Sequence, residues 1–245
     1  MLQLVRSELR KVSTVRGPWL LLGAGPLIVL AGIAGLVQSG ANLQDPATQS
    51  RALGHVGLAA IFTLVFGILA IAAEYRHGTI TDAYLTSPTR GKVMAAKLIV
   101  CALIGAAAGL LCSAVALAIA FAWWAADGAT FHISASGDWR ILVGGVAANI
   151  GLAIIGVGLG GLVRNVVGAV ALALAWVAVI EGIVGQLVGS GLARWLPFYA
   201  SQALEKVSIT GTPLLPQWGG GLMLLAYAAL FAGTAIVTTL RRDVP

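Results

Sequence analysis

The sequence predicts an all-α integral membrane protein with six transmembrane helices. Of its 245 residues, 59% are hydrophobic and 10% are charged, whereas about 25% are charged in an average soluble domain. The mean hydropathy is +0.94. The apolar residues fall in six stretches, each close to the roughly 20 residues that cross a bilayer as a helix. This composition excludes a soluble enzyme, a disordered chain and a disulfide-stabilised scaffold.

The first apolar stretch follows basic residues, as in a signal peptide, but its length of roughly 20 residues and the lack of a clear cleavage site predict a retained helix. The segments between the later stretches are too short for a separate soluble domain. Residues 1–245 are therefore expected to form one transmembrane domain. The six spans are expected at about 18–37, 54–73, 93–126 (only part of it in hydrocarbon), 141–163, 166–189 and 218–240.

Two segments outside the spans have their own patterns. In residues 1–17, apolar side chains recur at helical spacing from Leu2 to Val12, while the basic residues lie mostly on other faces. This pattern predicts an amphipathic helix at the membrane surface. Residues 190–217 are rich in aromatic residues and proline, which predicts short helices in the outer interface.

Lysine and arginine are distributed unequally between alternate flanks of the spans. Eleven lie in the flanks that include both termini, and four lie in the opposite flanks. Because cytoplasmic loops are enriched in these residues, both termini are expected in the cytoplasm. The net charge of +6 is spread over the ends of the spans and forms no soluble basic patch. We therefore expect no nucleic-acid partner.

Two glycine pairs have the spacing of close helix contacts in membranes. They are Gly105 with Gly109 and Gly156 with Gly160, and glycine supplies 32 residues of the chain. Small residues four positions apart let two helix backbones approach each other. We expect packing contacts between helices, with a specific dimer seam as the alternative.

The chain carries no recognisable catalytic or ATP-binding motif. Gly91-Lys92 is followed by valine and lacks the upstream glycine of a Walker A sequence. The three histidines lie in three different flanks, which makes a zinc site built from them implausible. Neither His-Glu-x-x-His nor Gly-x-Ser-x-Gly occurs. We expect a chain that is not itself an enzyme and that holds no metal or cofactor of its own.

One carboxylate lies inside a predicted span. Glu181 is the sixteenth residue counted from Val166, about 22 Å along the helix. An acidic group at such depth is costly and is a functional candidate. Three interpretations stay open: a structural group that is protonated or hydrogen-bonded to neighbouring helices, a residue that lines a cavity, and a proton-coupling residue.

The segment after the second span contains, in order, Glu74-Tyr-Arg76-His-Gly78-Thr79, Pro88-Thr-Arg90 and Lys97. The N-terminal segment contains Glu8-Leu-Arg10-Lys11 and then Thr14-x-Arg16-x-x-Trp19. Together these motifs resemble the N-terminal segment and the first cytoplasmic loop of type-2 ABC exporter permeases, bacterial members included. The six spans, the amphipathic start and the aromatic outer loop agree with that family. The resemblance therefore covers essentially the whole chain.

The resemblance implies the membrane-spanning subunit of an ABC exporter in the bacterial cytoplasmic membrane. A separate ATP-binding subunit, present in two copies, would bind ATP and Mg. A second permease copy or a related permease would complete the usual twelve spans. The cytoplasmic loop at 74–92 would be a coupling loop that docks on the ATP-binding subunit; an ordinary charged loop is the alternative. Glu74, Arg76, Gly78 and Thr79 would form or brace the docking surface, while Pro88, Arg90 and Lys97 would shape the return into the third span.

In such permeases the pathway follows the dimer interface, where the second and fifth helices meet. The residues expected near it are Phe62, Phe66, Asn149, Trp176 and Glu181. The cargo stays open among drugs, lipids, peptides and polysaccharides. Two other classes remain as alternatives. A self-contained secondary transporter should show ionisable groups or broken helices at mid-membrane, and a non-transport membrane protein such as a lipid-modifying enzyme needs clustered polar groups at one face.

Overall fold

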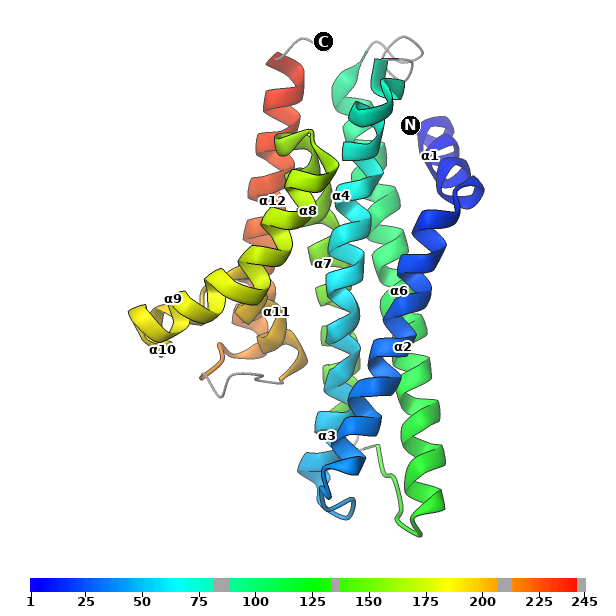
Figure 1. Cartoon of the computed structure of the whole chain (residues 1–245), viewed down its shortest axis with the longest axis vertical. Coiled ribbons are helices and arrows are strands. Elements are labelled where there is room, and N and C mark those ends of the chain that lie inside the picture. The colour runs from blue at the N-terminus through cyan, green and yellow to red at the C-terminus, as the bar shows by residue number, and fades with distance from the viewer. Residues whose placement is uncertain (82–88, 134–136, 207–212, 242–245) are drawn as a thin grey trace.

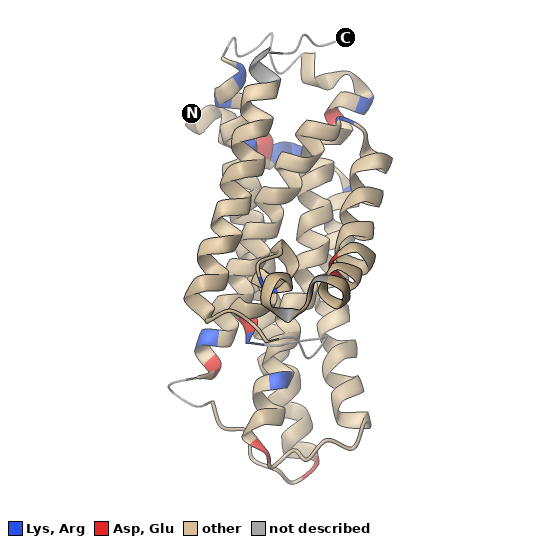
Figure 2. Cartoon of the chain, turned by 90° about the vertical axis from the view of Figure 1, so that its left-hand side faces the viewer, with Lys and Arg blue, Asp and Glu red and all other residues tan. Residues whose placement is uncertain are grey.

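The computed structural model describes residues 1–81, 89–133, 137–206 and 213–241, and within these ranges the chain is helical with no strand (Figure 1). Six helical segments in this part of the chain are long and apolar enough to cross a membrane, which confirms the prediction of an all-helical protein with six such segments. Charged residues gather toward the two ends of the bundle and are few along the helices between them (Figure 2). The six segments are Arg16–Gln38, Pro46–His77, Arg90–Ala126, Asp138–Val163, Val166–Leu187 and Gln217–Thr238.

The long helices α4, α6 and α7 run along the bundle, with α2 against α6 and α12 against α7 (Figure 1). Helix α1 and the end of α12 lie at the same end of the molecule (Figure 1). The helices are α1 (Leu2–Thr14), α2 (Arg16–Gln38), α3 (Pro46–Gly54), α4 (Ala60–His77), α6 (Arg90–Ala126), α7 (Asp138–Val163), α8 (Val166–Ala175), α9 (Glu181–Val188), α10 (Ser190–Ala193), α11 (Pro197–Glu205) and α12 (Gln217–Arg241).

Helices α4 and α7 form the most extensive pair in the bundle, and glycine makes their close approach possible. A Cβ atom at Gly67 of α4 would collide with the backbone carbonyl of Ala153, and one at Gly156 of α7 would collide with that of Leu64. The two glycine pairs singled out in the sequence all face neighbouring helices of the same chain. Their expected role in helix packing is therefore confirmed.

The second span is longer at both ends than predicted. Helix α3 and a 3-10 turn at His55–Ala59 lead into α4, and the helical segment runs from Pro46 to His77. Helix α4 thus continues through four residues that were expected to lie in the 74–92 loop. It ends at Gly78, whose φ of 69° lies in the left-handed region. On the return side α6 begins at Arg90.

The fifth span is a continuous helical segment in which α8 passes through a π-helical turn at Trp176–Ile180 before it continues as α9. Beyond this turn α9 leads away from the bundle toward α10 (Figure 1). The loop expected at 190–217 contains the short helices α10 and α11, as predicted. Helix α11 does not rest on the surface: it packs against α7 and α12, and its residues from Tyr199 to Glu205 are buried.

Candidate functional site

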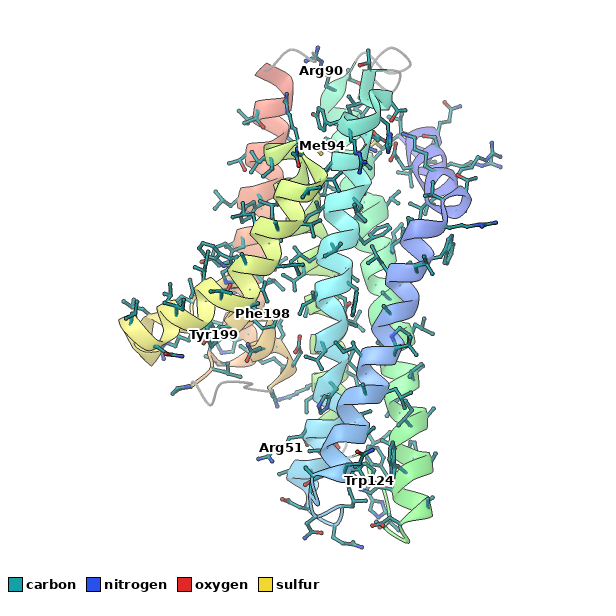
Figure 3. The ribbon with its side chains drawn as sticks, viewed as in Figure 1. Arg51, Arg90, Met94, Trp124, Phe198 and Tyr199 are labelled. Atoms are coloured by element: carbon teal, nitrogen blue, oxygen red, sulfur yellow. The ribbon has the colours of Figure 1, made fainter. Side chains whose placement is uncertain are left out.

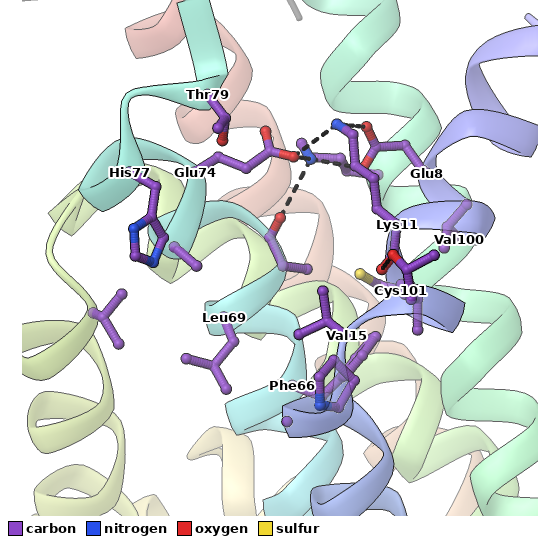
Figure 4. A pocket seen from close by; sticks show the side chains of 18 of the residues that line it. Glu8, Lys11, Val15, Phe66, Leu69, Glu74, His77, Thr79, Val100 and Cys101 are labelled. Carbon is purple, nitrogen blue, oxygen red and sulfur yellow. Dashed lines mark hydrogen bonds and ion pairs between the residues drawn. The ribbon is translucent and has the colours of Figure 1, made fainter.

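Four charged side chains from three helices meet at the end of the bundle where α1 lies (Figure 4). The Lys97 Nζ atom of α6 donates to Glu8 Oε2 at 2.7 Å and to Glu74 Oε1 at 2.6 Å. The Lys11 Nζ atom of α1 donates to Glu8 Oε1 at 2.7 Å and to Glu74 Oε1 at 2.8 Å. Each lysine thus bridges the same two carboxylates. We call Glu8, Lys11, Glu74 and Lys97 the ion cluster.

The two lysines of the ion cluster differ in burial. The Lys97 side chain is 1% exposed, and its ammonium also donates to the Ala70 carbonyl at 3.3 Å. A cation this deeply buried is tolerated only with charged or hydrogen-bonding partners, and here it has three. Lys11 is 46% exposed. Burial lowers the pKa of Lys11, but the hydrogen bonds and charges of Glu74 and Glu8 outweigh it and leave that pKa raised.

The cluster attaches α1 to the body of the protein. Val15, in an extended conformation, separates α1 from α2 and lets the chain turn there. Glu8 and Lys11 come from α1, Glu74 from the last turn of α4, and Lys97 from the second turn of α6. The orientation of α1 is therefore linked by charge to the end of α4.

Besides the ion pairs of Glu74 with α1 and α6, a cation–π contact holds the same end of α4. The guanidinium of Arg164, in the turn between α7 and α8, lies 4.9 Å from the ring centroid of Tyr75. Arg164 itself has a φ of 55°, unusual for a residue other than glycine. This cation–π contact connects the α7–α8 turn to the residue next to Glu74. Helices α1 and α6 and the α7–α8 turn thus converge on one helix end.

The residues predicted for coupling separate into two groups. Glu74 and Lys97 come together in the ion cluster, whereas Arg76, Gly78 and Thr79 are exposed at the end of α4. Arg90 is the first residue of α6, and Pro88 lies outside the described residues. The sequence reasoning did not pair Glu8 and Lys11 with Glu74. The available signal was a lysine at the start of a span, which requires a buried acidic partner from elsewhere.

An apolar cavity of about 610 Å³ lies beside the ion cluster, where α1 turns into α2 (Figure 4). We call it the elbow cavity. Most of its wall is apolar, and Val166 at the start of α8 is part of that wall. Phe66, expected near a transport pathway, is one of its buried wall residues. Other apolar wall residues are Val12, Val15, Pro18, Leu69 and Cys101.

Glu181 holds the start of α11. Its carboxylate accepts hydrogen bonds from the backbone N–H of Phe198 at 3.0 Å and of Tyr199 at 3.2 Å, and from the Trp176 indole N–H at 2.8 Å. Phe198 and Tyr199 are the second and third residues of α11, where backbone N–H groups have no helical partner (Figure 3). The side chain is 1% exposed. This geometry agrees with the first of the three interpretations, a structural group that is hydrogen-bonded to its neighbours. A pathway role for Glu181 and Trp176 stays a prediction.

Asn149 lies inside the contact between α4 and α7. It is fully buried, donates from Nδ2 to the Gly145 carbonyl at 2.8 Å, and accepts at its own carbonyl from the Thr63 hydroxyl at 3.1 Å. Phe62, on the same helix as Thr63, is half-buried. The pathway candidates are therefore spread over separate places: the elbow cavity, the α4–α7 contact, and the junction of α9 with α11.

The sequence reasoning missed Glu205, the last residue of α11. It is 6% exposed, and its Oε1 atom has no hydrogen-bond partner among the described residues. The carboxyl group packs directly on Gly57, at a place that any side chain on Gly57 would occupy. Burial raises the pKa of Glu205 well above its ordinary value. The folded protein therefore favours the neutral acid at this position.

Comparison with known proteins gives no assignment: no protein-family model matches the sequence, and no curated protein matches it either. Among the described residues, no three of His, Cys, Asp and Glu come together in a group that could hold a metal ion.

Proposed function

We propose that this chain is the membrane-spanning permease subunit of an ABC exporter, with ATP and Mg bound by a separate subunit. Six membrane-length helices and the order of motifs at residues 8–19 and 74–97 support this assignment. Both termini then lie in the cytoplasm, as the distribution of Lys and Arg predicts, in a bacterial cytoplasmic membrane.

The observation that carries the proposal is the bracing of the α4 end. Immediately after the braced residues Glu74 and Tyr75, the chain exposes Arg76, turns at Gly78 and exposes Thr79. A segment that receives force from another subunit must be exposed and must also be rigidly connected to the membrane helices. The ion cluster and the Arg164–Tyr75 contact provide this connection to α1, α6 and the α7–α8 turn.

In the proposed mechanism, ATP closes two copies of the partner subunit, and the segment after α4 moves with them. Because α4 is packed along α7 through glycine contacts, a displacement at its end is transmitted along both helices. Packed helices of this kind move by sliding or as rigid units. The cargo would cross where two permease subunits meet, alternating between access to the two sides of the membrane.

The second permease subunit would meet α8 and α9. These helices expose large apolar side chains over their whole length, and only 17% of the most apolar window of the span is buried within the chain. The π-helical turn at Trp176–Ile180 lies in the middle of this exposed face. We propose that this face meets a second copy or a related permease, with the remaining area facing lipid. The large exposed side chains include Val167, Leu172, Trp176, Val179, Ile183 and Leu187.

The test is purification of the tagged chain from its native membrane in a mild detergent, followed by mass spectrometry and an ATPase assay. We expect a near-stoichiometric partner that contains Walker A and Walker B motifs and hydrolyses ATP. An Arg51→Glu variant, changed at an exposed residue at the opposite end of the bundle, should retain the partner (Figure 3). A chain that purifies alone as a stable oligomer across several gentle detergents would contradict the proposal.

A self-contained secondary transporter is the second candidate, and Glu205 is the observation that favours it. A buried carboxyl that holds a proton can serve as a coupling site. The two candidates differ in one measurement: transport by the reconstituted chain without any partner. Uptake driven by a proton gradient and abolished in Glu205→Gln would favour the secondary transporter, whereas dependence on ATP and a second protein favours the exporter.

A further inference from the structure

The elbow cavity has the dimensions of a binding site. Its volume of about 610 Å³ is within the range of about 300–1,000 Å³ typical of small-molecule sites. Its apolar wall comes from α1, α2, α4, α6 and the start of α8, so an apolar chain placed there would contact several helices at once. The ion cluster lies along one side of it (Figure 4).

The ionic side chains that line the elbow cavity carry a net positive charge, because Lys11, Lys97 and Arg76 outnumber Glu8 and Glu74. Three of the four carboxylate oxygens of Glu8 and Glu74 accept hydrogen bonds from the cluster lysines, and the fourth, Glu74 Oε2, is buried without a hydrogen-bond partner among the described residues. Lys11 uses two of its three N–H donors in the cluster and is 46% exposed. Arg76 also lines the cavity and is exposed. An anionic group therefore fits this rim better than a cationic one.

The neighbouring surface indicates where the occupant comes from. Helix α1 exposes Leu2 at 86% and Leu9 at 40%, and Trp19 near the start of α2 is 56% exposed. Exposed apolar and aromatic side chains beside basic residues are typical of a helix that lies at the membrane–water interface. An acyl chain of that leaflet can therefore enter between α1 and α4 while its headgroup stays at the level of Lys11 and Arg76.

We propose that the elbow cavity binds an anionic phospholipid from the leaflet in which α1 lies. One acyl chain occupies the space between Phe66, Leu69 and Ala73, and the phosphate accepts hydrogen bonds from Lys11 and Arg76. This site does not depend on the proposed export function, since it is built from the chain alone. Its occupation would hold α1 in place beside the ion cluster.

The test uses the full-length chain in phosphatidylcholine vesicles that contain a phosphatidylglycerol with a photoactivatable acyl chain. We expect cross-links in peptides that cover residues 12–18 and 66–73. Unlabelled phosphatidylglycerol should compete at least about tenfold better than phosphatidylcholine, because each basic residue near an anionic headgroup contributes about fivefold. Equal competition by the two lipids would overturn the headgroup assignment. Labelling confined to lipid-facing peptides of α6 and α12 would overturn the cavity site.

Two matched pairs of variants sharpen the test. Ala73→Phe places a ring in the cavity and should reduce labelling there about tenfold, since it excludes at least two methylene groups of the chain. Ala118→Phe, on the exposed face of α6, should leave labelling unchanged. Arg76→Gln should reduce the preference for phosphatidylglycerol about fivefold, and Arg51→Gln should not. Unchanged labelling in Ala73→Phe, with a monodisperse protein, would refute the site.

Discussion

Lys97→Met removes the buried cation of the ion cluster and keeps a side chain of similar length. Lys97 is 1% exposed and lies 2.7 Å from Glu8 and 2.6 Å from Glu74. The variant leaves two carboxylates at the same place with Lys11 alone between them. Removing one partner of a buried ion pair costs about 3–5 kcal/mol of stability. For a chain of this size that corresponds to a fall of roughly 6–20 °C in the unfolding midpoint.

Lys11→Met is the matched comparison. Lys11 contacts the same two carboxylates at 2.7 and 2.8 Å, but its side chain is 46% exposed. Partly exposed ion pairs are screened by water and contribute about 0–1 kcal/mol. We therefore expect its unfolding midpoint to fall by at most about 4 °C. The two variants isolate burial as the variable, because partners and distances are nearly the same.

The assay is thermal unfolding in a mild detergent, followed by the loss of the monodisperse peak in size-exclusion chromatography. Hydrogen exchange of residues 2–14 reports separately on α1, which should lose protection in Lys97→Met before the whole chain unfolds. Equal midpoints for the two variants would refute the reasoning about burial. Unchanged protection of α1 in Lys97→Met would refute its attachment through the ion cluster.

Three further predictions concern Gly67, Glu181 and Glu205. Gly67→Ala should destabilise the chain by about 1–3 kcal/mol in thermal unfolding, because the added Cβ meets the backbone of α7. Gly23→Ala, with open space around the added Cβ, should leave the stability unchanged. Equal effects of the two substitutions would refute the close contact. Glu181→Gln should speed hydrogen exchange at the start of α11 and cost about 1–3 kcal/mol, whereas unchanged exchange would remove Glu181 from its anchoring role. The raised pKa of Glu205 means that the folded protein favours the neutral acid. The contribution of Glu205 to the free energy of unfolding is therefore largest below about pH 4.3, the pKa of glutamate in an unfolded chain. Above that pH it falls by up to about 1.4 kcal/mol per pH unit. Glu205→Gln should remove this decline above about pH 4.3, and an unchanged pH profile of stability would contradict the assignment.

The sequence predicted the helices well because a membrane-spanning helix depends on local composition. An apolar run of the right length is sufficient evidence, and each predicted span has a helix in the structure. The ends of α4 were less predictable. Glu74 begins a polar run that looks like a loop, yet it stays helical because its charge is paired with Lys97, 23 residues later, and with Lys11, 63 residues earlier. No local pattern encodes such pairs.

The candidate site was predicted only in part for the same reason. Glu74 and Lys97 were selected from a resemblance, but Glu8 lies 89 residues from Lys97 and no spacing rule connects them. Glu181 was recognised as unusual, whereas its partners are backbone N–H groups of α11, which carry no residue-specific signal. Glu205 was missed because a glutamate in a segment expected at the outer interface gives no sign of burial until α11 folds back against Gly57.

A direct contact between the segment after α4 and an ATP-hydrolysing subunit is the central claim. It can be measured by placing a photo-cross-linking amino acid at position 79, which is exposed at that end, and at position 51, which is exposed at the other end. Irradiation of native membranes should join position 79, and not position 51, to a protein with Walker A and Walker B motifs. The absence of such a product at position 79, or the same product at both positions, would contradict the account.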